Sequence, residues 1–398
     1  MNQRERWLAT MHFQPVDHVP DKEFGYWPET LEAWHARGLP EYVNDNPRAS
    51  IYFGFEQTAG IPMHSGLLPG FEYQVIEEDD RHLVILDCDG AKKLIHKDGS
   101  TSIPQFLKFP VESRADWEEF KKRLDATTPG RFFGHSVTID RTPSAKMQVE
   151  PAAEEDWNAW RADVEHSDRP LGISAGSLFG YIRDWMGFER VCYTIMDDPG
   201  LVQDIMEHLT EFSLALIDRP TRMVKFDFAA MWEDMCFNQG SILPPKYFKE
   251  WMVPRLKRIT GCLAERGCDV VFVDCDGNIN ELVPLWLEAG VNCMFPVEIR
   301  AGTDPVELRE KYGHQVLLMG GVDKFALIAG QEETKNEIAR IKPVVEDGGY
   351  IPHVDHRCPP DVTLENYLYY LKVKRDTFGI PEPEPWQVRK EQYEWANQ

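Results

Sequence analysis

Short apolar runs alternate with longer amphipathic segments through the second half of the chain. Each run is rich in Val, Ile, Leu or Phe. The segments between them carry helix-start signals such as Asp198-Pro199 and Asp304-Pro305, where Asp caps the helix and Pro takes its first position. Strands alternating with helices are typical of parallel β/α architecture. The pattern predicts strands at 171–175, 224–232, 269–274, 291–296, 316–319 and 348–352, and helices at 245–266, 280–289, 304–313, 322–341 and 364–378.

A closed barrel accounts for these units better than an open sheet. If residues 19–24 supply a first strand, about seven or eight strand–helix units are available, as a (β/α)8 TIM-type barrel requires. No GxGxxG follows a predicted strand, which argues against a dinucleotide-binding sheet. Alternating stretches at 73–77 and 82–86 predict hairpins. We therefore expect an α/β fold, with a single barrel domain over residues 1–398, a hairpin-rich insertion at about 50–130 after the first strand, and a C-terminal tail at 381–398.

Composition narrows the class of protein. The 398 residues are 42% hydrophobic and 27% charged, as in a soluble globular protein, and no apolar run is long enough to span a membrane. The N-terminal residues lack the apolar stretch of a signal peptide, so we expect a cytoplasmic protein. A formal net charge of -23 disfavours nucleic acid and anionic membranes as partners and leaves a small-molecule substrate. The 8 cysteines contain no CxxC pair, so we expect reduced thiols; the oligomeric state stays open.

Chemistry-bearing residues gather where the predicted strands end. The stretch VVFVDCDGN runs from a buried strand into Asp274, Cys275 and Asp276, and the two carboxylates, at i and i+2, face the same way on an extended chain. In a barrel the active site lies at the carboxyl ends of the strands. Carboxylate, imidazole and thiolate together suit zinc or a similar divalent ion. The candidate metal ligands are Asp274, Asp276, His356, Cys275 and Cys358.

Other polar residues after the predicted strands are candidates for catalysis and substrate binding. Simpler interpretations stay open: Asp276 could cap the helix predicted at 280–289, the histidines could be structural, and Glu233-Asp234 could be a solvated pair. The candidate catalytic residues are Glu233, Asp234, Tyr26 and His353. The candidate substrate-binding residues are Glu23, Ser177, Arg183, Glu298, Asp323 and Lys324.

Several stretches carry a family resemblance, among them RERWLATMHFQPVDHVP, SLFGYIRDWMGFER, MWEDMCFNQGSILPP, VDCDGNINELVPLWLEAGVNCMFPVE, VLLMGGVDK and GGYIPHVDHRCPPDVTLENYLYYL. With them the chain resembles the uroporphyrinogen decarboxylase superfamily, which includes corrinoid-linked methyltransferases. The resemblance implies a single distorted (β/α)8 barrel. On this resemblance, a chain that acts as the true decarboxylase would carry an arginine-rich N-terminal segment, which binds a tetrapyrrole with many carboxylates. Here that region reads HVPDKEFGYWPET, whose acids would repel a polyanion, so porphyrinogen decarboxylation is disfavoured.

The methyltransferase branch implies a zinc site built from an HxCG motif and a later cysteine. Those positions fall here on Asp274-Cys275-Asp276-Gly277 and near His356, with Cys358 two residues on. Carboxylates therefore stand where the relatives have imidazole and thiolate. Such a site would have harder ligands than the thiol-activating zinc of the relatives.

Three hypotheses follow for the function. The first is a methyltransferase-type enzyme that moves a methyl group between a small methylated substrate or carrier and a corrinoid (cobalamin-type) protein, assisted by a divalent metal, with zinc implied by the resemblance. The second is a metal-independent decarboxylase or lyase acting on a small acid, in which Asp274 and Asp276 titrate as a coupled pair. The third is a relative that binds a corrinoid or another small molecule without turnover.

Overall fold

The centre of the molecule is a curled, 7-stranded parallel sheet in the order β1-β6-β7-β10-β11-β12-β13. The structure is a computed structural model that describes residues 1–98, 103–134 and 152–396. Every strand predicted after residue 171 is present, although β12 continues through the glycines at 320–321 instead of ending there. The strands are β1 Ala59–Gly60, β6 Leu171–Gly176, β7 Phe228–Trp232, β10 Val271–Asp274, β11 Cys293–Phe295, β12 Leu317–Val322 and β13 Tyr350–Val354.

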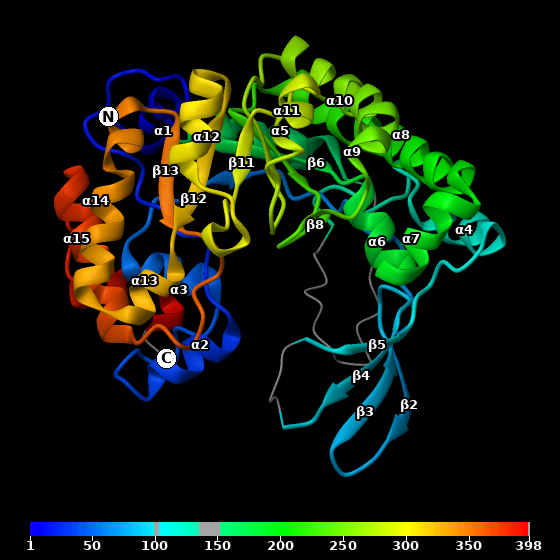
Figure 1. The fold of residues 1–398 in the computed structure, drawn as a ribbon, viewed down its shortest axis with the longest axis horizontal. Helices are drawn as coiled ribbons and strands as arrows, with labels where there is room; N and C mark the ends of the chain where they lie inside the picture. The colour runs from blue at the N-terminus through cyan, green and yellow to red at the C-terminus, as the bar shows by residue number, and fades with distance from the viewer. Residues whose placement is uncertain (99–102, 135–151, 397–398) are drawn as a thin grey trace.

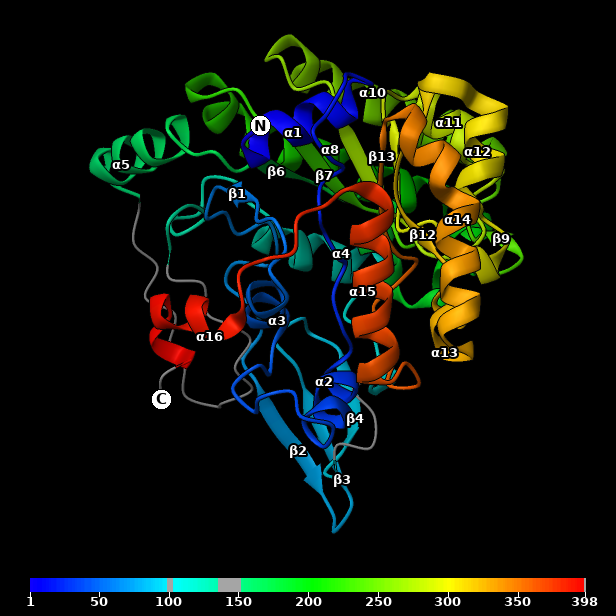
Figure 2. The same ribbon diagram turned by 90° about the vertical axis from the view of Figure 1, so that its left-hand side faces the viewer.

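Helices surround the outside of this sheet (Figures 1 and 2). Two predicted helix starts are confirmed: Asp198 accepts a 3.0 Å hydrogen bond from Leu201 N, and Asp304 accepts one of 2.7 Å from Val306 N. The helix predicted at 364–378 has those bounds. The helices of the described residues, apart from 3-10 turns, are α1 Gln3–Met11, α2 Pro28–His35, α3 Asn46–Phe53, α4 Arg114–Phe120, α5 Glu154–Glu165, α6 Phe179–Met186, α7 Phe188–Asp197, α8 Pro199–Met223, α9 Pro245–Tyr247, a π-helical turn at Phe248–Met252, α10 Val253–Glu265, α11 Val283–Glu288, α12 Pro305–Tyr312, α13 Lys324–Ala329, α14 Gln331–Asp347, α15 Leu364–Phe378 and α16 Trp386–Arg389.

The expected first strand at 19–24 is wrong, and with it the closed eight-stranded barrel. The first strand of the sheet is the short β1, and the segment 21–27 lies between β13 and β1 without forming a strand. Its backbone still contacts both sides: Asp21 O accepts a 2.9 Å hydrogen bond from Glu56 N, and Gly25 O accepts one of 2.9 Å from Cys358 N. The parallel sheet therefore forms a half-barrel, and an irregular segment covers its open side.

A buried ionic network holds this segment in place. Lys374 of α15, whose side chain is 0% exposed, lies 2.7 Å from Glu23 Oε1 and 2.9 Å from Asp21 Oδ1. Glu23 Oε1 also accepts a 2.7 Å hydrogen bond from the Tyr370 hydroxyl, and Oε2 accepts one of 3.2 Å from Val354 N of β13. A carboxylate thus bonds the edge of β13 where a neighbouring strand would. Side-chain pairing replaces the missing strand ladder.

The expected hairpin insertion is present and follows the first strand. Its four strands, β2 Gln74–Glu78, β3 His82–Leu86, β4 Lys92–His96 and β5 Gln105–Lys108, form an antiparallel sheet that projects from the body (Figure 1). Two helices, α3 and α4, lie near the ends of the insertion. Residues 99–102 of the insertion and 397–398 of the tail lie outside the described residues.

The amino ends of the strands are closed by α1. Trp7 and Met11 pack there against Val270, Leu317 and Ile351 in a cluster separate from the main core. Because α1 occupies this end, the interior of the half-barrel opens towards the carboxyl ends of the strands.

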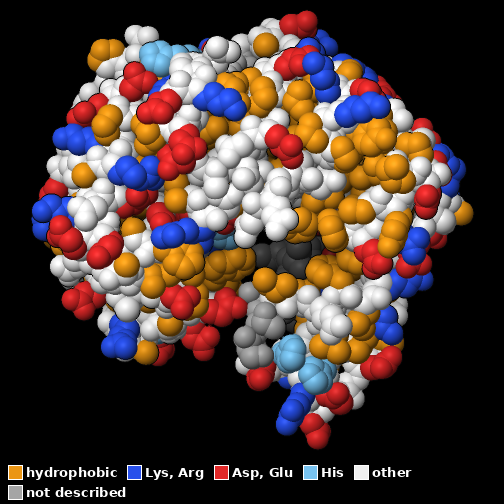
Figure 3. All heavy atoms as spheres, in the orientation of Figure 1, with side chains coloured by type: hydrophobic (Ala, Val, Ile, Leu, Met, Phe, Trp, Pro, Cys, Tyr) orange, Lys and Arg blue, Asp and Glu red, His pale blue; other side chains and the backbone are white. Residues whose placement is uncertain are grey.

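The surface carries charges of both signs. On the face drawn in Figure 3, Lys and Arg side chains are interspersed with Asp and Glu. Within the described residues, no helix combines the length and the apolar character needed to cross a bilayer.

Candidate active site

A cavity of about 450 Å³ occupies the interior of the half-barrel. Trp7 of α1 lies at one end and Asp274 at the end of β10 lies at the other. Alternation along β10 produces this arrangement: Val271 and Val273 pack outwards into the main core, whereas Phe272 and Asp274 line the cavity. The walls are largely apolar and aromatic, as in many small-molecule sites.

Asp274 places an unpaired carboxyl group in this cavity. No hydrogen bond or ion pair of its side chain is found among the described residues, although the cavity walls surround it. Burial raises the pKa of Asp274 to about 7, and the nearby charges of Asp276 and Asp234 act in the same direction. A carboxyl group that exchanges its proton near neutral pH meets the main requirement for general acid–base catalysis.

Asp276 and His356, two of the predicted metal ligands, contact each other beside Asp274. His356 Nε2 lies 3.3 Å from Asp276 Oδ2, and the imidazole stacks on Trp27 with ring centroids 5.4 Å apart. Burial opposes protonation of His356, but its hydrogen bond to Asp276 outweighs this and raises the pKa above its ordinary value. Asp276 Oδ1 is buried without a hydrogen-bond partner among the described residues. The pair adds charge and hydrogen-bonding capacity to the mouth of the cavity.

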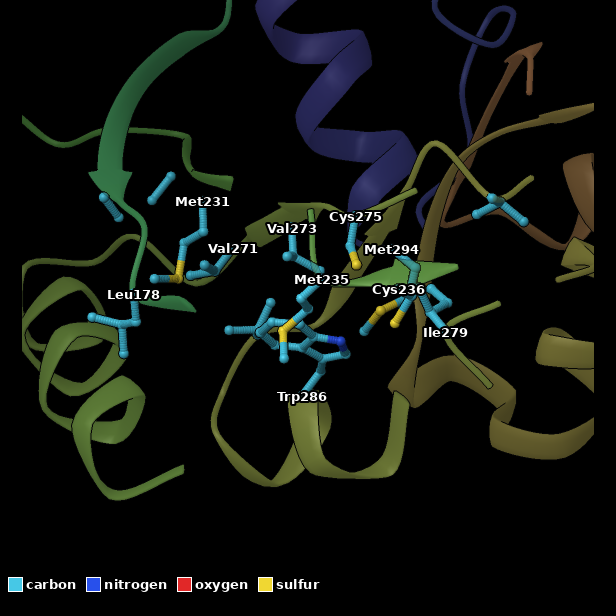
Figure 4. Close-up of a cluster of buried hydrophobic side chains, with 14 of the residues drawn as sticks. Leu178, Met231, Met235, Cys236, Val271, Val273, Cys275, Ile279, Trp286 and Met294 are labelled. Carbon is cyan, nitrogen blue, oxygen red and sulfur yellow. The ribbon is translucent and has the colours of Figure 1, made fainter. Parts of the chain in front are cut away.

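The two cysteines predicted as metal ligands do not join this pair. Cys275 is 2% exposed and points to the outer side of the sheet, among Met235, Cys236 and Trp286 (Figure 4). Cys358 is 1% exposed, and its Sγ contacts the backbone oxygen of Pro359. Burial raises the pKa of both thiols well above the ordinary value, which disfavours the thiolate that a metal needs.

The donor set does not fit a resident zinc ion. In residues 1–98, 103–134 and 152–396, no group of three or more His, Cys, Asp and Glu side chains is arranged to hold a metal. Catalytic zinc sites have three protein ligands and structural ones have four. Asp276 and His356 supply a pair of donors that already contact each other. The predicted five-residue ligand set is therefore not assembled by the described residues.

This geometry predicts the metal content of the protein. Protein purified without chelator is expected to contain well under one equivalent of zinc, because the described residues do not assemble a three-ligand set. Elemental analysis by plasma mass spectrometry measures this directly. Cys358→Ala should leave the content unchanged because its thiol faces the backbone of Pro359. A stoichiometric metal that disappears in Cys358→Ala would contradict the assignment.

Glu233 and Ser177 hold a helix, which corrects their predicted roles. Glu233 is 0% exposed, and its carboxylate accepts hydrogen bonds from the backbone N–H groups of Leu178 and, at 2.8 Å, Gly180 at the start of α6. Ser177 Oγ accepts a 3.1 Å bond from Tyr181 N in the same turn. Burial raises the pKa of Glu233 to about 7, although these N–H donors act against it. Both residues fix α6 instead of facing the cavity.

Arg183 and Asp234 form an ion pair near the cavity. Arg183 Nη1 lies 2.7 Å from Asp234 Oδ2, and the guanidinium lies over the ring of Trp232, which lines the cavity. Burial raises the pKa of Asp234 above its ordinary value, and Arg183 works against this. The two predicted residues therefore come together, and Arg183 is held by α6 in reach of the cavity wall.

Lys324, Glu298 and Asp323 form ion pairs outside the cavity. Lys324 Nζ lies 3.3 Å from Glu298 Oε1 and 3.2 Å from Asp355 Oδ1. Glu298 Oε2 accepts a 2.9 Å hydrogen bond from Gly277 N, which fixes the loop that carries Asp276. Asp323 caps α13 through Phe325 N and pairs with Arg300. None of the three lines the cavity among the described residues, so their predicted contact with substrate is replaced by support of the mouth loops.

Of the remaining candidates, His353 and Glu23 line the cavity and Tyr26 does not. The Tyr26 hydroxyl lies 2.6 Å from that of Tyr367 in the core, which corrects its catalytic prediction. His353 Nδ1 lies 2.8 Å from Val354 O and therefore carries the hydrogen. Burial lowers the pKa of His353 to about 3, so the imidazole is neutral. Both oxygens of Glu23 are taken by the buried network.

Sequence reasoning missed Lys22 and the aromatic walls. Lys22 lines the cavity between two residues of the ionic network. A lysine inside a stretch offered as the first strand of a barrel was the available signal, since lysine is almost never fully buried without a partner. Trp232, Tyr181 and Phe24 also line the cavity, but scattered aromatic residues of this kind are ordinarily core residues.

Comparison with known proteins gives consistent matches. The model of the family described as uroporphyrinogen decarboxylase matches residues 167–376, more than half of the chain. A uroporphyrinogen decarboxylase from Granulibacter bethesdensis is 25% identical over 137 residues, which are 34% of this chain; the chain spans only 39% of the length of that relative. A solved methyltransferase from Methanosarcina mazei superimposes with a TM-score of 0.56 at 16% identity, covering 94% of this chain and 99% of that one. The structural likeness concerns the fold.

Proposed function

The chain belongs to the uroporphyrinogen decarboxylase family, and from that premise we propose that it moves a methyl group between a small methylated substrate and a corrinoid carried by a partner protein. The observation that carries the proposal is Asp274, an unpaired carboxyl group with a pKa raised to about 7, at the mouth of an apolar cavity. The shared fold with a protein named as a methyltransferase supports the same direction.

Transfer of a methyl group away from oxygen or nitrogen leaves electrons on that heteroatom. In the proposed step the carbon–heteroatom bond breaks, the methyl group passes to the acceptor, and the heteroatom takes the proton of Asp274. The corrinoid would supply the nucleophilic centre that accepts the methyl group. The negative charge of Asp276 helps to keep Asp274 protonated, and the apolar walls exclude water from the reacting atoms.

The charge of the cavity opposes a polyanionic substrate. Among the described residues that line it, Lys22 is the sole lysine or arginine, whereas Glu23 and Asp274 are acidic. A tetrapyrrole with many carboxylates would have to leave most of them unpaired in apolar surroundings, which costs several kcal/mol for each. A small substrate with little charge fits the lining better.

An anaerobic assay tests the proposed function. The protein is incubated with cob(I)alamin as acceptor and with small methyl ethers or methylamines, and formation of methylcobalamin is followed by absorbance. Formation that requires the protein and is lost in Asp274→Asn supports methyl transfer. A complete lack of methylcobalamin with every compound of the panel would contradict it.

Decarboxylation of a small acid is the second candidate, because the same protonated Asp274 could deliver a proton to the carbanion that loss of CO2 leaves behind. The raised pKa of Asp274 is the specific observation behind it. The same incubations decide between the two: release of CO2 without a methyl acceptor favours decarboxylation, whereas acceptor-dependent loss of a methyl group favours transfer.

The pKa of Asp274 predicts the pH dependence of the reaction. An acid with a raised pKa keeps its proton up to that pKa, so the proton-donating form is present below pH 7 and is lost above it. We expect kcat/KM for methyl transfer to fall above about pH 7, approaching tenfold per pH unit. Initial rates at saturating acceptor between about pH 5.5 and 9 measure the profile. A profile that stays flat or rises through this range would rule out Asp274 as the proton donor.

A further inference from the structure

Lys22 brings an unpaired positive charge into the cavity. Its Nζ donates a 3.2 Å hydrogen bond to the backbone oxygen of Glu56, and no ion pair of Lys22 is found in the described part of the chain. The carboxylate of Glu56 is instead paired with Arg6 at 2.7 Å. Because an ammonium group has three N–H donors, this single bond leaves donors available to a ligand.

The ammonium group lies at the floor of the cavity, away from Asp274. Its partner Glu56 precedes β1, and Ala59 of β1 is paired with Leu171, the first residue of β6. Asp274 is the last residue of β10 and so marks the opposite, carboxyl end of the parallel sheet. The cavity therefore has a cation at its closed end and a proton donor at its open end.

The wall between these ends is aromatic. Ring centroids lie 5.1 Å apart for Trp7 and Phe228, 5.7 Å for Phe228 and Phe272, 5.7 Å for Phe272 and Phe295, and 4.6 Å for Phe295 and Phe24. These rings form a continuous series, and each lines the cavity. Aromatic rings favour offset or edge-to-face contacts with another flat ring. The wall suits a flat ligand.

The positive charge of Lys22 at the floor of the cavity is energetically unfavourable unless a ligand compensates it. Burial lowers the pKa of Lys22 to about 8, although the charge of Glu56 acts against this, and the side chain stays mainly cationic at neutral pH. A buried charge without a partner is unfavourable, and an incoming anion would remove that penalty. The neighbouring Lys374 shows the contrast, since Asp21 and Glu23 already neutralise it.

We propose that the substrate is an aromatic monocarboxylate whose carboxylate pairs with Lys22 and whose methylated group lies at Asp274. The methylated end rests on the proposed function, whereas the anion site rests on Lys22 and the aromatic wall alone. A single cation selects for a single negative charge, because a second carboxylate would lie against aromatic rings. The same arrangement disfavours decarboxylation of the bound carboxylate, since Lys22 stabilises that group at the end away from the acid.

Calorimetric titration of the full-length protein without a methyl acceptor tests the anion site. The probes are benzoate, the neutral benzyl alcohol and the dianionic isophthalate, and the proteins are wild type, Lys22→Met and Lys335→Met. Lys335 is an exposed lysine of α14 and provides the matched control. Lys22→Met keeps a side chain of similar length and removes the charge.

Wild type and Lys335→Met are expected to bind benzoate at least about tenfold more tightly than benzyl alcohol or isophthalate. Lys22→Met should weaken benzoate binding by about tenfold or more and leave benzyl alcohol within about twofold. Equal binding of benzoate and benzyl alcohol in wild type would overturn the proposal even if Lys22→Met does not fold. Benzoate binding that survives Lys22→Met would overturn it as well. Selective benzoate binding without transfer from any methoxybenzoate would leave the anion site but overturn the substrate assignment. The proposed function itself would be contradicted only if no compound of the methyl ether and methylamine panel reacts.

Discussion

Asp274→Asn is expected to lower kcat for methyl transfer by about 10²- to 10⁴-fold, the usual contribution of a general acid. Asparagine keeps the size of the side chain but cannot give up a proton at neutral pH. Because the carboxyl group of Asp274 makes no hydrogen bond or ion pair with the described residues, the exchange breaks no internal contact. Because burial and the neighbouring carboxylates disfavour the charged form of Asp274, we expect the unfolding midpoint of Asp274→Asn at neutral pH to be no lower than that of wild type. Steady-state and single-turnover rates with cob(I)alamin as acceptor measure the effect.

Asp197→Asn is the matched control for this prediction. Asp197 is an exposed aspartate at the end of α7, and its exchange should leave the rate unchanged within about twofold. Binding of benzoate should also survive Asp274→Asn, since Lys22 lies at the other end of the cavity. A rate in Asp274→Asn close to that of wild type would mean that the proton comes from another group.

Lys374→Met is expected to lower the free energy of unfolding by about 3–5 kcal/mol. The ammonium group is fully buried between Asp21 and Glu23, at 2.9 and 2.7 Å. Burial acts to lower the pKa of Lys374, but these carboxylates outweigh it and raise the pKa. Lys374 therefore stays protonated inside the protein. Removing the cation leaves Glu23 without an ion pair next to the irregular segment at 21–27, whereas Asp21 keeps Arg375 at 2.9 Å. Urea unfolding followed by circular dichroism measures the loss.

Lys372→Met provides the comparison for the buried network. Lys372 lies two positions earlier on α15, is 65% exposed and pairs with Asp376 at 2.6 Å. Exposed pairs of this kind contribute about 1 kcal/mol or less. If Lys374→Met lowers the free energy of unfolding no more than Lys372→Met does, the buried ionic network does not hold the segment at 21–27. Adding Glu23→Gln to Lys374→Met should recover part of the loss, because one unpaired charge is removed.

The strands after residue 171 could be predicted because each is short, apolar and followed by a helix signal. α15 was predicted with its observed bounds, and the alternation of β10 placed Asp274 correctly towards the interior. The segment at 19–24 was expected to form the first strand, yet it is held largely through the side chains of Glu23 and Lys374. Long-range ion pairs between residues so far apart leave no local pattern in a sequence.

The candidate site was predicted in part for related reasons. Asp276 and His356 meet, although they come from different strand ends, because parallel strands bring their carboxyl ends together. Cys275 lies between Asp274 and Asp276 and faces the opposite side of the sheet, so the period of two that favours the acids excludes the thiol. Glu233 follows β7, whereas the helix that it anchors, α6, follows β6. Spacing along the sequence does not reveal this contact between the ends of two strands. Lys22 was missed because its role depends on the pairing of the Glu56 carboxylate with Arg6, a contact between residues far apart in the sequence.

The fate of a labelled methyl group tests the central claim most directly. In a single turnover under anaerobic conditions, the protein is mixed with cob(I)alamin and one compound at a time from a panel of CD3-labelled methoxybenzoates, anisole and methylamines. Mass spectrometry then quantifies the label on the corrinoid and the demethylated product. The account predicts CD3-cobalamin and hydroxybenzoate in equal amounts from a methoxybenzoate, with both lost in Asp274→Asn. Unlabelled corrinoid with every compound of the panel would contradict methyl transfer.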